Sequence, residues 1–185
     1  MTNENENVLL HNIQARREEW KELRKKTVGS SEIATIAGLN KFQTPLSLWA
    51  EKTGRTPPVE ENEYMRLGTH LEPFIGSLFA RTYGKSVFAN TNLYVHPIHD
   101  FATATPDFFV TEHTIEEGNV VVEKSKGILE CKSTSAHNLS NWQDGNIPNT
   151  AHLQIVWQMG IVGMVRGWVA ALVGGNPNDF FSPPF

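Results

Sequence analysis

Apolar residues recur at helical spacing through the first 85 residues, which predicts a helical N-terminal part. Residues 8–26, "VLLHNIQARREEWKELRKK", combine this spacing with many Leu, Glu, Lys and Arg, which are good helix formers. In "TPLSLWAEKTGRTPP", Pro45 suits the first helical turn and Gly54 the end. Two further helices are predicted, "EYMRLGTHLEPFIGSLFARTYG" and the shorter "VGSSEIATIAGLN", with a Ser as N-cap of the shorter one and Gly38 at its end.

The pattern changes after residue 85 to short segments rich in Val, Phe and Thr and bounded by turn residues. These segments are "SVFANTNLYVHP", "DFATATPDFFVTE", "NVVVEKS" and "GILECKS", and they predict strands of a largely antiparallel sheet, with "EEGN" at 116–119 as a hairpin turn. A helix, "NTAHLQIVWQMGIVGM", and a buried strand, "RGWVAALVGG", follow. The order of elements predicts an α/β or α+β domain with helices flanking one sheet. The expected packing side of the last helix comprises Leu153, Val156, Trp157, Gly160, Ile161 and Met164.

Composition narrows the class of protein. The chain has 185 residues, of which 39% are hydrophobic, so we expect one domain with a substantial core. There is no apolar run of about 18 residues, so no transmembrane helix is predicted, and the polar N-terminus does not resemble a signal peptide. The single Cys131 excludes an internal disulfide and a Cys-based zinc site, and it fits a reducing cytoplasm. The net charge of −4 argues against a generally basic nucleic-acid binder but allows a local basic groove.

The segment "GILECKS" places charges within a predicted strand. Because side chains alternate between the two faces of a strand, Glu130 and Lys132 should share one face while Leu129 and Cys131 point to the other. Asp107, in "TPDFF", lies 23 residues before Glu130, a separation that one hairpin can span. Asp107 and Glu130 could therefore meet on adjacent strands, with Glu72 of the long helix as a third candidate carboxylate.

Two interpretations of these charges remain open from the residues alone. Converging carboxylates with a backbone carbonyl would suit Mg²⁺, which could neutralise a phosphate and lower the pKa of a water, while Lys132 would orient or deprotonate that water or stabilise developing charge. Alternatively, Glu130 and Lys132 are an ordinary ion pair on a solvated face, the commoner origin of acid–x–Lys. Similar alternatives hold elsewhere. Arg24 could belong to a solvated helix face, and His96, His99 and Asp100 could be a metal cluster or, as we favour, turn packing.

Six ordered motifs make the chain recognisable from about Trp20 to Gly175. They are "WKELRKKTVGSSEIATIAGL", "TPLSLWAEKTG", "RLGTHLEPFIGSLFARTYG", "HPIHDFATATPD", "ILECKST" and "GNIPNTAHLQIVWQMGIVG". Each is modest alone, but together and in this order they are specific. The chain resembles the YqaJ-type viral recombinase family, which includes the phage lambda exonuclease, within the PD-(D/E)xK nuclease superfamily.

The resemblance implies a fold and an activity. The implied fold is α/β with a restriction-endonuclease-like core, in which helices flank a mixed central sheet. We expect residues 1–185 to form a single domain with tails at 1–8 and 176–185. The implied activity is a Mg²⁺-dependent exonuclease, with Mn²⁺ as a substitute, that digests one strand of linear duplex DNA from its 5′ end in phage-type recombination. The implied partners are double-stranded DNA ends, a single-strand annealing protein and two further copies in a ring-shaped homotrimer, in a cytoplasmic setting.

The resemblance also implies roles for residues of this sequence. Asp107, Glu130 and the Cys131 backbone carbonyl would bind the metal, and Lys132 would be the catalytic lysine. Glu72 would be the helical acid that positions a water or a second metal, and Gln154 would complete the catalytic set. The residues expected to bind the 5′ phosphate or DNA are Arg24, Ser30, Ser31 and Thr105.

Three departures from the family pattern bear on these roles. The family often has Gln-x-Gln on the helix after the lysine strand, whereas this chain has Gln154 and Val156, with Gln158 on the same helix face as a possible replacement. Phe108 stands where the family commonly has Gly, and the sequence stops at "GGNPNDFFSPPF", where relatives usually continue, which suggests a shortened member. The alternatives are an endonuclease or RecB-like nuclease of the same fold, or a catalytically weak module that binds DNA ends. An iron–sulfur version is excluded because there is one Cys.

Overall fold

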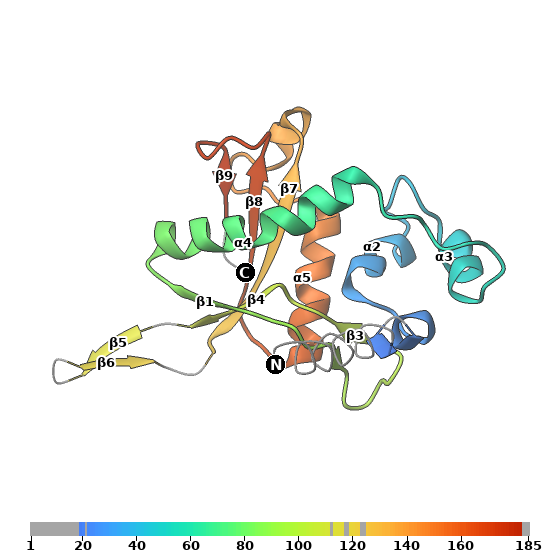
Figure 1. Cartoon of the computed structure of the whole chain (residues 1–185), viewed down its shortest axis with the longest axis horizontal. Coiled ribbons are helices and arrows are strands. Elements are labelled where there is room, and N and C mark those ends of the chain that lie inside the picture. The colour runs from blue at the N-terminus through green and yellow to red at the C-terminus, as the bar shows by residue number, and fades with distance from the viewer. Residues whose placement is uncertain (1–18, 21, 112, 117–118, 123–124, 183–185) are drawn as a thin grey trace, which may run out of the picture.

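The computed structural model describes residues 19–182 except 21, 112, 117–118 and 123–124, and describes no side chains between 112 and 124. Residues 22–26 are helical, as predicted, while residues 8–18 of that segment lie outside the described part. The chain then forms η1, α2, α3 and the long helix α4 before the strands begin (Figure 1). The bounds of these four helices are η1 Ser30–Glu32, α2 Ile33–Ile36, α3 Pro45–Lys52 and α4 Glu63–Tyr83.

The strands and the last helix complete the domain (Figure 1). Their bounds are β1 Ser86–Ala89, β2 Tyr94–Val95, β3 Thr103–Ala104, β4 Phe108–Thr111, β5 His113–Glu116, β6 Asn119–Val122, β7 Gly127–Thr134, α5 Asn149–Val162, β8 Gly167–Val173 and β9 Phe180–Phe181, with a 3-10 helix η2 at Ala136–Asn141. β5 and β6 pair antiparallel with Glu116 opposite Asn119, which confirms the predicted hairpin.

The main sheet has five strands in the order β1-β4-β7-β8-β9. β7 and β8 are parallel, with Glu130 opposite Val169, whereas the other neighbours are antiparallel. The sheet is therefore mixed, as the family resemblance implied, and largely antiparallel, as the strand pattern predicted. The parallel pair arises because α5 lies between β7 and β8 in the chain. The helix carries the chain back to the end of the sheet where β7 began, so that β8 can run in the same direction as β7.

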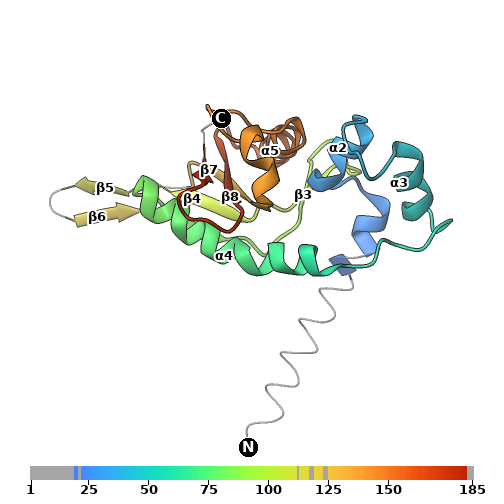
Figure 2. The same ribbon diagram turned by 90° about the horizontal axis from the view of Figure 1, so that it is seen from above.

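Helices α4 and α5 cover opposite faces of this sheet (Figure 2). On one face, Ile75 and Phe79 of α4 pack with Leu129 and Trp168. On the other face, Ile155 of α5 packs with Ile128, Val169 and Ala171. Alternate residues of β7 and β8 thus enter two separate cores, so β8 is buried on both sides along its length and β7 is buried on both sides as far as Cys131.

The buried side of α5 differs from our prediction. Its buried residues are Ala151, Ile155, Gln158 and Ile161, while Val156 is 48% exposed and Gly160 is also exposed. The helix is apolar nearly all round, so the sequence carries no clear stripe that would mark the core side. The buried side of α5 includes one polar side chain, Gln158, which lies fully buried above the sheet.

The N-terminal helices are fixed to the edge of the domain by short contacts. The backbone of Val28 pairs with the chain at Phe101 and Thr103, and the hydroxyls of Thr27 and Thr103 lie 3.1 Å apart. The predicted Ser N-cap is wrong, because Gly29 caps η1 and the Glu32 carboxylate accepts from the Gly29 N–H at 2.8 Å. In the next helix, α3, the N-cap is Thr44, whose side chain accepts a hydrogen bond from the N–H of Ser47.

The expected tails fare differently at the two ends. Residues 1–8 lie outside the described part of the chain. Within 176–182, β9 pairs with β8, Phe181 opposite Ala171, and Ser182 is buried, so this expected tail contains an edge strand. None of the described helices is long and apolar enough to cross a membrane.

Candidate active site

The two faces of β7 carry different chemistry, as the alternation in its sequence predicted. Leu129 and Cys131 belong to the apolar core under α4. Glu130 and Lys132 face the other way, where they bond to side chains of α5. Glu130 is only 4% exposed, which rules out an ion pair on a solvated face.

Asp107 reaches the same place from the neighbouring strand. It precedes β4, whose Phe108 pairs with Leu129 of β7, and its Oδ2 accepts a 2.7 Å hydrogen bond from the backbone N–H of Cys131. The predicted meeting across adjacent strands is confirmed. Phe108, where the family commonly has Gly, is buried on the α4 side, and a Cβ at Gly76 would lie 2.8 Å from its ring. Gly76 therefore makes the room that Phe108 needs.

Every polar contact of Glu130 is made inside the protein. Its Oε1 accepts from Lys132 Nζ at 2.7 Å and from Gln154 Nε2, and its Oε2 accepts from Gln158 Nε2 at 2.7 Å. Lys132 Nζ also donates to Gln154 Oε1 at 2.8 Å. A buried carboxylate needs such charge-assisted bonds, because a buried charge left without its partner costs roughly 3–5 kcal/mol. We call Asp107, Glu130, Lys132, Gln154 and Gln158 the carboxylate cluster.

Gln158 answers the question raised by the missing second glutamine of the family pattern. Its side chain is fully buried, and Nε2 donates both to Glu130 and, at 3.3 Å, to Ser30 Oγ. Its Oε1 is buried and has no hydrogen-bond partner in the described part of the molecule. Gln158 thus joins Gln154 at the Glu130 carboxylate, in keeping with its predicted place on the same helix face, while Val156 lies outside the cluster.

The acids of this region repel one another. Burial raises the pKa of Asp107 well above its ordinary value, and the nearby charge of Glu130 raises it further. Burial, followed by the charge of Glu130, also raises the pKa of Glu72. For Lys132 burial alone would lower the pKa, but the charge of Glu130 and its hydrogen bond raise it, so the lysine stays cationic. Carboxylates held together at this cost are what a cation site requires.

The donor set fits a hard divalent cation. Asp107 and Glu130 supply two carboxylates. The backbone N–H of Cys131 faces Asp107, and the N–H and C=O of one strand residue point to the same edge of the strand. The Cys131 carbonyl therefore points toward the Asp107 side as well. Among the described residues, no three His, Cys, Asp or Glu side chains lie close enough together to bind one metal ion. Glu72 is therefore not a third side-chain ligand beside Asp107 and Glu130. One or two carboxylates with waters are the usual ligands of Mg²⁺ in proteins.

Arg24 lies at a second polar site, beside Ser31, another of the residues predicted for the phosphate. Its Nη2 donates to Ser31 Oγ at 3.2 Å and lies 3.7 Å from Glu32 Oε1, and the guanidinium stacks over Trp20. Lys52 Nζ bonds Glu32 Oε2 at 2.9 Å and the carbonyls of Arg24 and Thr27. We call Arg24, Ser30, Ser31, Glu32 and Lys52 the arginine corner.

The other residues predicted for the phosphate are placed as follows. Ser30 is buried and joins the arginine corner to the carboxylate cluster through its bond to Gln158. Thr105 is partly buried and lies two residues before Asp107. Glu32 and Lys52 were not identified from the sequence, because their pairing joins a short helix to α3 and depends on tertiary packing.

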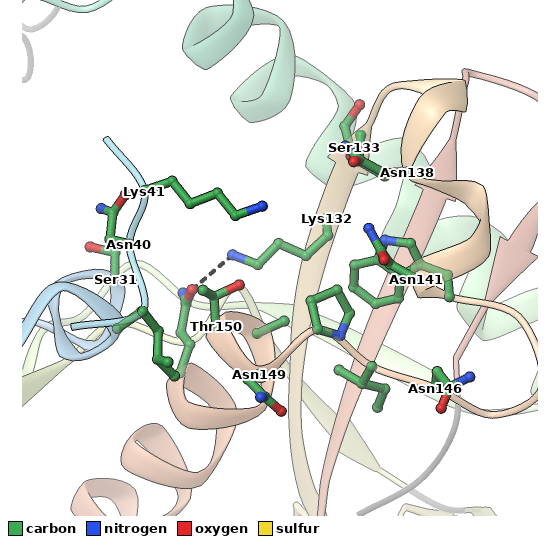
Figure 3. A pocket seen from close by; sticks show the side chains of 18 of the residues that line it. Ser31, Asn40, Lys41, Lys132, Ser133, Asn138, Asn141, Asn146, Asn149 and Thr150 are labelled. Carbon is green, nitrogen blue, oxygen red and sulfur yellow. Dashed lines mark hydrogen bonds between the residues drawn. The ribbon is translucent and has the colours of Figure 1, made fainter. Parts of the chain in front are cut away.

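A groove of about 890 Å³ opens beside Lys132. Lys41 and Lys132 extend into it from opposite sides, one from the loop before α3 and one from β7 (Figure 3). Its remaining polar lining is Ser, Thr, Asn and Gln, and none of the described residues that line it is Asp or Glu. The net charge of −4 allowed a local basic groove, and this groove, with two lysines and no acidic residue among its described lining, fits that expectation. Much of this lining comes from the Asn-rich stretch "HNLSNWQDGNIPNT".

The histidines near residue 100 pack as a turn. His96 Nδ1 accepts from the backbone N–H groups of Ile98 and His99, both at 3.1 Å, and the rings of His96 and His99 stack 4.9 Å apart. Two backbone N–H groups of the turn thus occupy His96 Nδ1, which supports the packing interpretation.

Known proteins are similar to this chain in sequence or in fold. An uncharacterized protein YqaJ of Bacillus subtilis (strain 168) is 35% identical over 179 residues, which is 95% of this chain and 52% of the relative, so the chain spans about half the relative's length. An alkaline exonuclease (LHK-Exo) from Laribacter hongkongensis has the same fold, with a TM-score of 0.65 and 21% identity over 91% of this chain and 81% of that one. The same exonuclease in complex with dAMP gives a TM-score of 0.66 at 20% identity, with the same coverage.

The family model for the YqaJ-like viral recombinase domain matches residues 19–165. That match covers the helical N-terminal part, the carboxylate cluster and the arginine corner, all the parts from which the two polar sites are built. The chain therefore belongs to the YqaJ-like viral recombinase domain family.

Proposed function

We propose that the chain is a Mg²⁺-dependent 5′→3′ exonuclease that digests one strand of linear duplex DNA in phage-type homologous recombination. The observation that carries the proposal is the carboxylate cluster, in which Asp107 and Glu130 converge with Lys132, a residue that lines a groove whose described lining has no Asp or Glu. An acidic pair beside a cationic side chain suits hydrolysis of a phosphodiester, whose transition state gains negative charge.

Mg²⁺, held by Asp107, Glu130 and the Cys131 carbonyl, would neutralise the scissile phosphate and lower the pKa of an attacking water. Mn²⁺ has similar ligand preferences and should substitute. Lys132, kept cationic by Glu130, would orient the water or stabilise the developing charge on the phosphate. Gln154 and Gln158 hold the Glu130 carboxylate, so they fix its direction, and Glu72 would position a water from the α4 side.

The arginine corner supports the proposed 5′ preference. Arg24, Ser31 and Ser30 present a guanidinium and two hydroxyls, and Thr105 lies in the segment leading to Asp107. A guanidinium fork with hydroxyls suits a terminal phosphate, which carries more charge than an internal one. Ser30 connects this corner to Glu130 through Gln158, so a bound 5′ end would lie beside the metal ligands.

The experiment uses linear duplexes of one sequence labelled at either the 5′ or the 3′ end of one strand. With Mg²⁺, the 5′ label should be released first as mononucleotide, while the 3′-labelled strand shortens progressively. Covalently closed circular DNA should survive. Early release of the 3′ label would reverse the polarity, and nicking of the circle would indicate an endonuclease of the same fold.

The proposed activity would leave 3′ single strands, which a single-strand annealing protein would bind as its substrate. We therefore propose such a protein as partner and, following the family resemblance, a homotrimer around the DNA. Light scattering of the purified chain with and without duplex tests the assembly. A monomer under both conditions would remove the trimer from the proposal without affecting the proposed chemistry.

A further inference from the structure

Phe42 is an aromatic side chain displayed in solvent at the rim of the groove. It is 98% exposed, more than any other large apolar side chain in the described part of the chain. It lines the same groove as Lys132 and Gln154. A single exposed apolar side chain is common on protein surfaces, so the exposure of Phe42 matters here only because the ring lies in the groove that Lys41 and Lys132 also line.

The backbone that carries Phe42 is held in place. Asn40 Oδ1 accepts from the N–H of Phe42 at 2.9 Å, and Asn40 Nδ2 donates at 2.8 Å to Thr35 Oγ1, which is 1% exposed. Two residues later, Thr44 caps α3. The ring is therefore presented from an ordered turn between two helices, which lowers the entropy lost when a ligand binds.

The chemistry around the ring fits a nucleic-acid strand. Lys41 and Lys132 both extend into the groove (Figure 3), and its described lining includes no carboxylate to repel a phosphate, although the chain is acidic overall. The polar remainder consists of hydroxyls and amides such as Asn138 and Asn149, which can bond phosphates or base edges. Surfaces that bind single strands combine a basic groove with an aromatic ring on which a base stacks.

We propose that Phe42 is a stacking residue for an unpaired nucleobase of the DNA strand in this groove, with Lys41 on the adjoining phosphate. This inference deepens the proposed function and rests on it for the identity of the substrate. It adds a specificity that the carboxylate cluster cannot supply, because a stacked base must first leave its duplex. The site should therefore favour frayed or overhanging ends over fully paired ones.

The test measures fluorescence of 2-aminopurine, a base analogue quenched by stacking, in duplexes with a short unpaired end. The whole chain is titrated in EDTA, so that the DNA stays intact. Wild type and Phe42→Tyr should quench the probe, while Phe42→Ala should lose the quenching and bind the unpaired end roughly 5- to 100-fold more weakly, the range for one stacked base. Tyr64→Ala, which removes a ring that is 87% exposed outside the groove, should behave as wild type.

The position of the probe identifies the strand. If the probe is quenched when it lies in the 5′-ended strand, the stacked base belongs to the strand that is cut. If the probe is quenched only when it lies in the opposite strand, the stacked base belongs to the complement. Equal quenching by wild type and Phe42→Ala, or no binding by wild type, overturns the stacking role. Digestion with Mg²⁺ is assayed separately, so quenching that depends on Phe42 without digestion would contradict the proposed nuclease while leaving the stacking site in place.

Discussion

The carboxylate cluster and the arginine corner are two polar sites joined by one hydrogen bond, yet they are built differently. Glu130 in the cluster is 4% exposed and has all its bonds inside the protein, whereas the side chain of Arg24 is 33% exposed and its nearest carboxylate lies 3.7 Å away. A change in the cluster therefore leaves a buried charge unpaired. A change in the corner should alter which DNA end is preferred while the chemistry persists.

The shared contact explains how the two sites cooperate. Ser30 Oγ and Glu130 Oε2 both accept from the single Nε2 of Gln158, which fixes the distance between the corner and the metal ligands. An end bound at the corner is thus placed at a set position relative to Glu130. The following changes separate the two sites, beginning with the one of largest expected effect.

Replacing Lys132 should abolish the chemistry and leave binding. Lys132→Ala removes the ammonium that bonds Glu130 and Gln154, so we expect digestion to fall by roughly 10²- to 10⁴-fold. Binding of duplex ends, measured by fluorescence anisotropy, should change little. Lys25→Ala on the exposed N-terminal helix serves as control. Loss of binding in parallel with digestion would mean that Lys132 holds the DNA rather than acting on it.

Gln158 should matter more than the family position beside it. Gln158→Leu keeps the volume but removes the donor to Glu130 and Ser30, so we expect metal affinity or digestion to fall by roughly 10- to 100-fold. Val156→Gln restores the family's glutamine at an exposed position and should change digestion less than about threefold, since it does not reach the cluster. The opposite ranking of these variants would show that the missing glutamine limits activity.

Arg24 should set the preference between DNA ends. Arg24→Ala removes the guanidinium beside Ser31, and we expect the ratio of digestion rates on 5′-phosphate and 5′-hydroxyl ends to fall roughly tenfold, as for one charge-assisted bond. The rate on 5′-hydroxyl ends should stay the same. Arg66→Ala, at an exposed surface pair on α4, is the control. A constant ratio would remove Arg24 from the phosphate site.

The raised pKa of Asp107 predicts a pH-dependent stability. Since burial and Glu130 raise this pKa in the folded state, the folded protein holds the proton at higher pH than the unfolded chain does. The contribution of Asp107 is therefore most favourable at low pH and is lost as pH rises through the folded pKa. In EDTA, Asp107→Asn should raise Tm at neutral pH, by about 2–4 °C per kcal/mol relieved, and the gain should shrink toward acid pH.

Magnesium should reverse this difference, because only wild type keeps both carboxylates. Exposed Asp144→Asn is the control, and it should shift Tm at neither pH. A gain for Asp107→Asn that is independent of pH would show that the carboxylate is not destabilised by its neighbours.

Parts of this site followed from the sequence because they depend on local geometry. The period of two along a strand placed Glu130 and Lys132 on one face, and the length of a hairpin brought Asp107 to them. The shared face of Gln154 and Gln158 also followed from their spacing, but the buried side of α5 as a whole did not, because the helix is apolar nearly all round and the parallel return to β8 decides which side faces the sheet. The groove joins Lys41 to residues near 140, and such distant pairs depend on tertiary packing.

The central claim is that Asp107, Glu130 and Lys132 form a metal-dependent site for cutting DNA. The most direct measurement is release of acid-soluble nucleotides from 5′-phosphorylated linear duplex, with Mg²⁺ or with EDTA, by wild type and by Asp107→Ala. We expect release only by wild type with Mg²⁺. Equal release in EDTA, equal release by Asp107→Ala, or none by wild type with Mg²⁺ would contradict the claim.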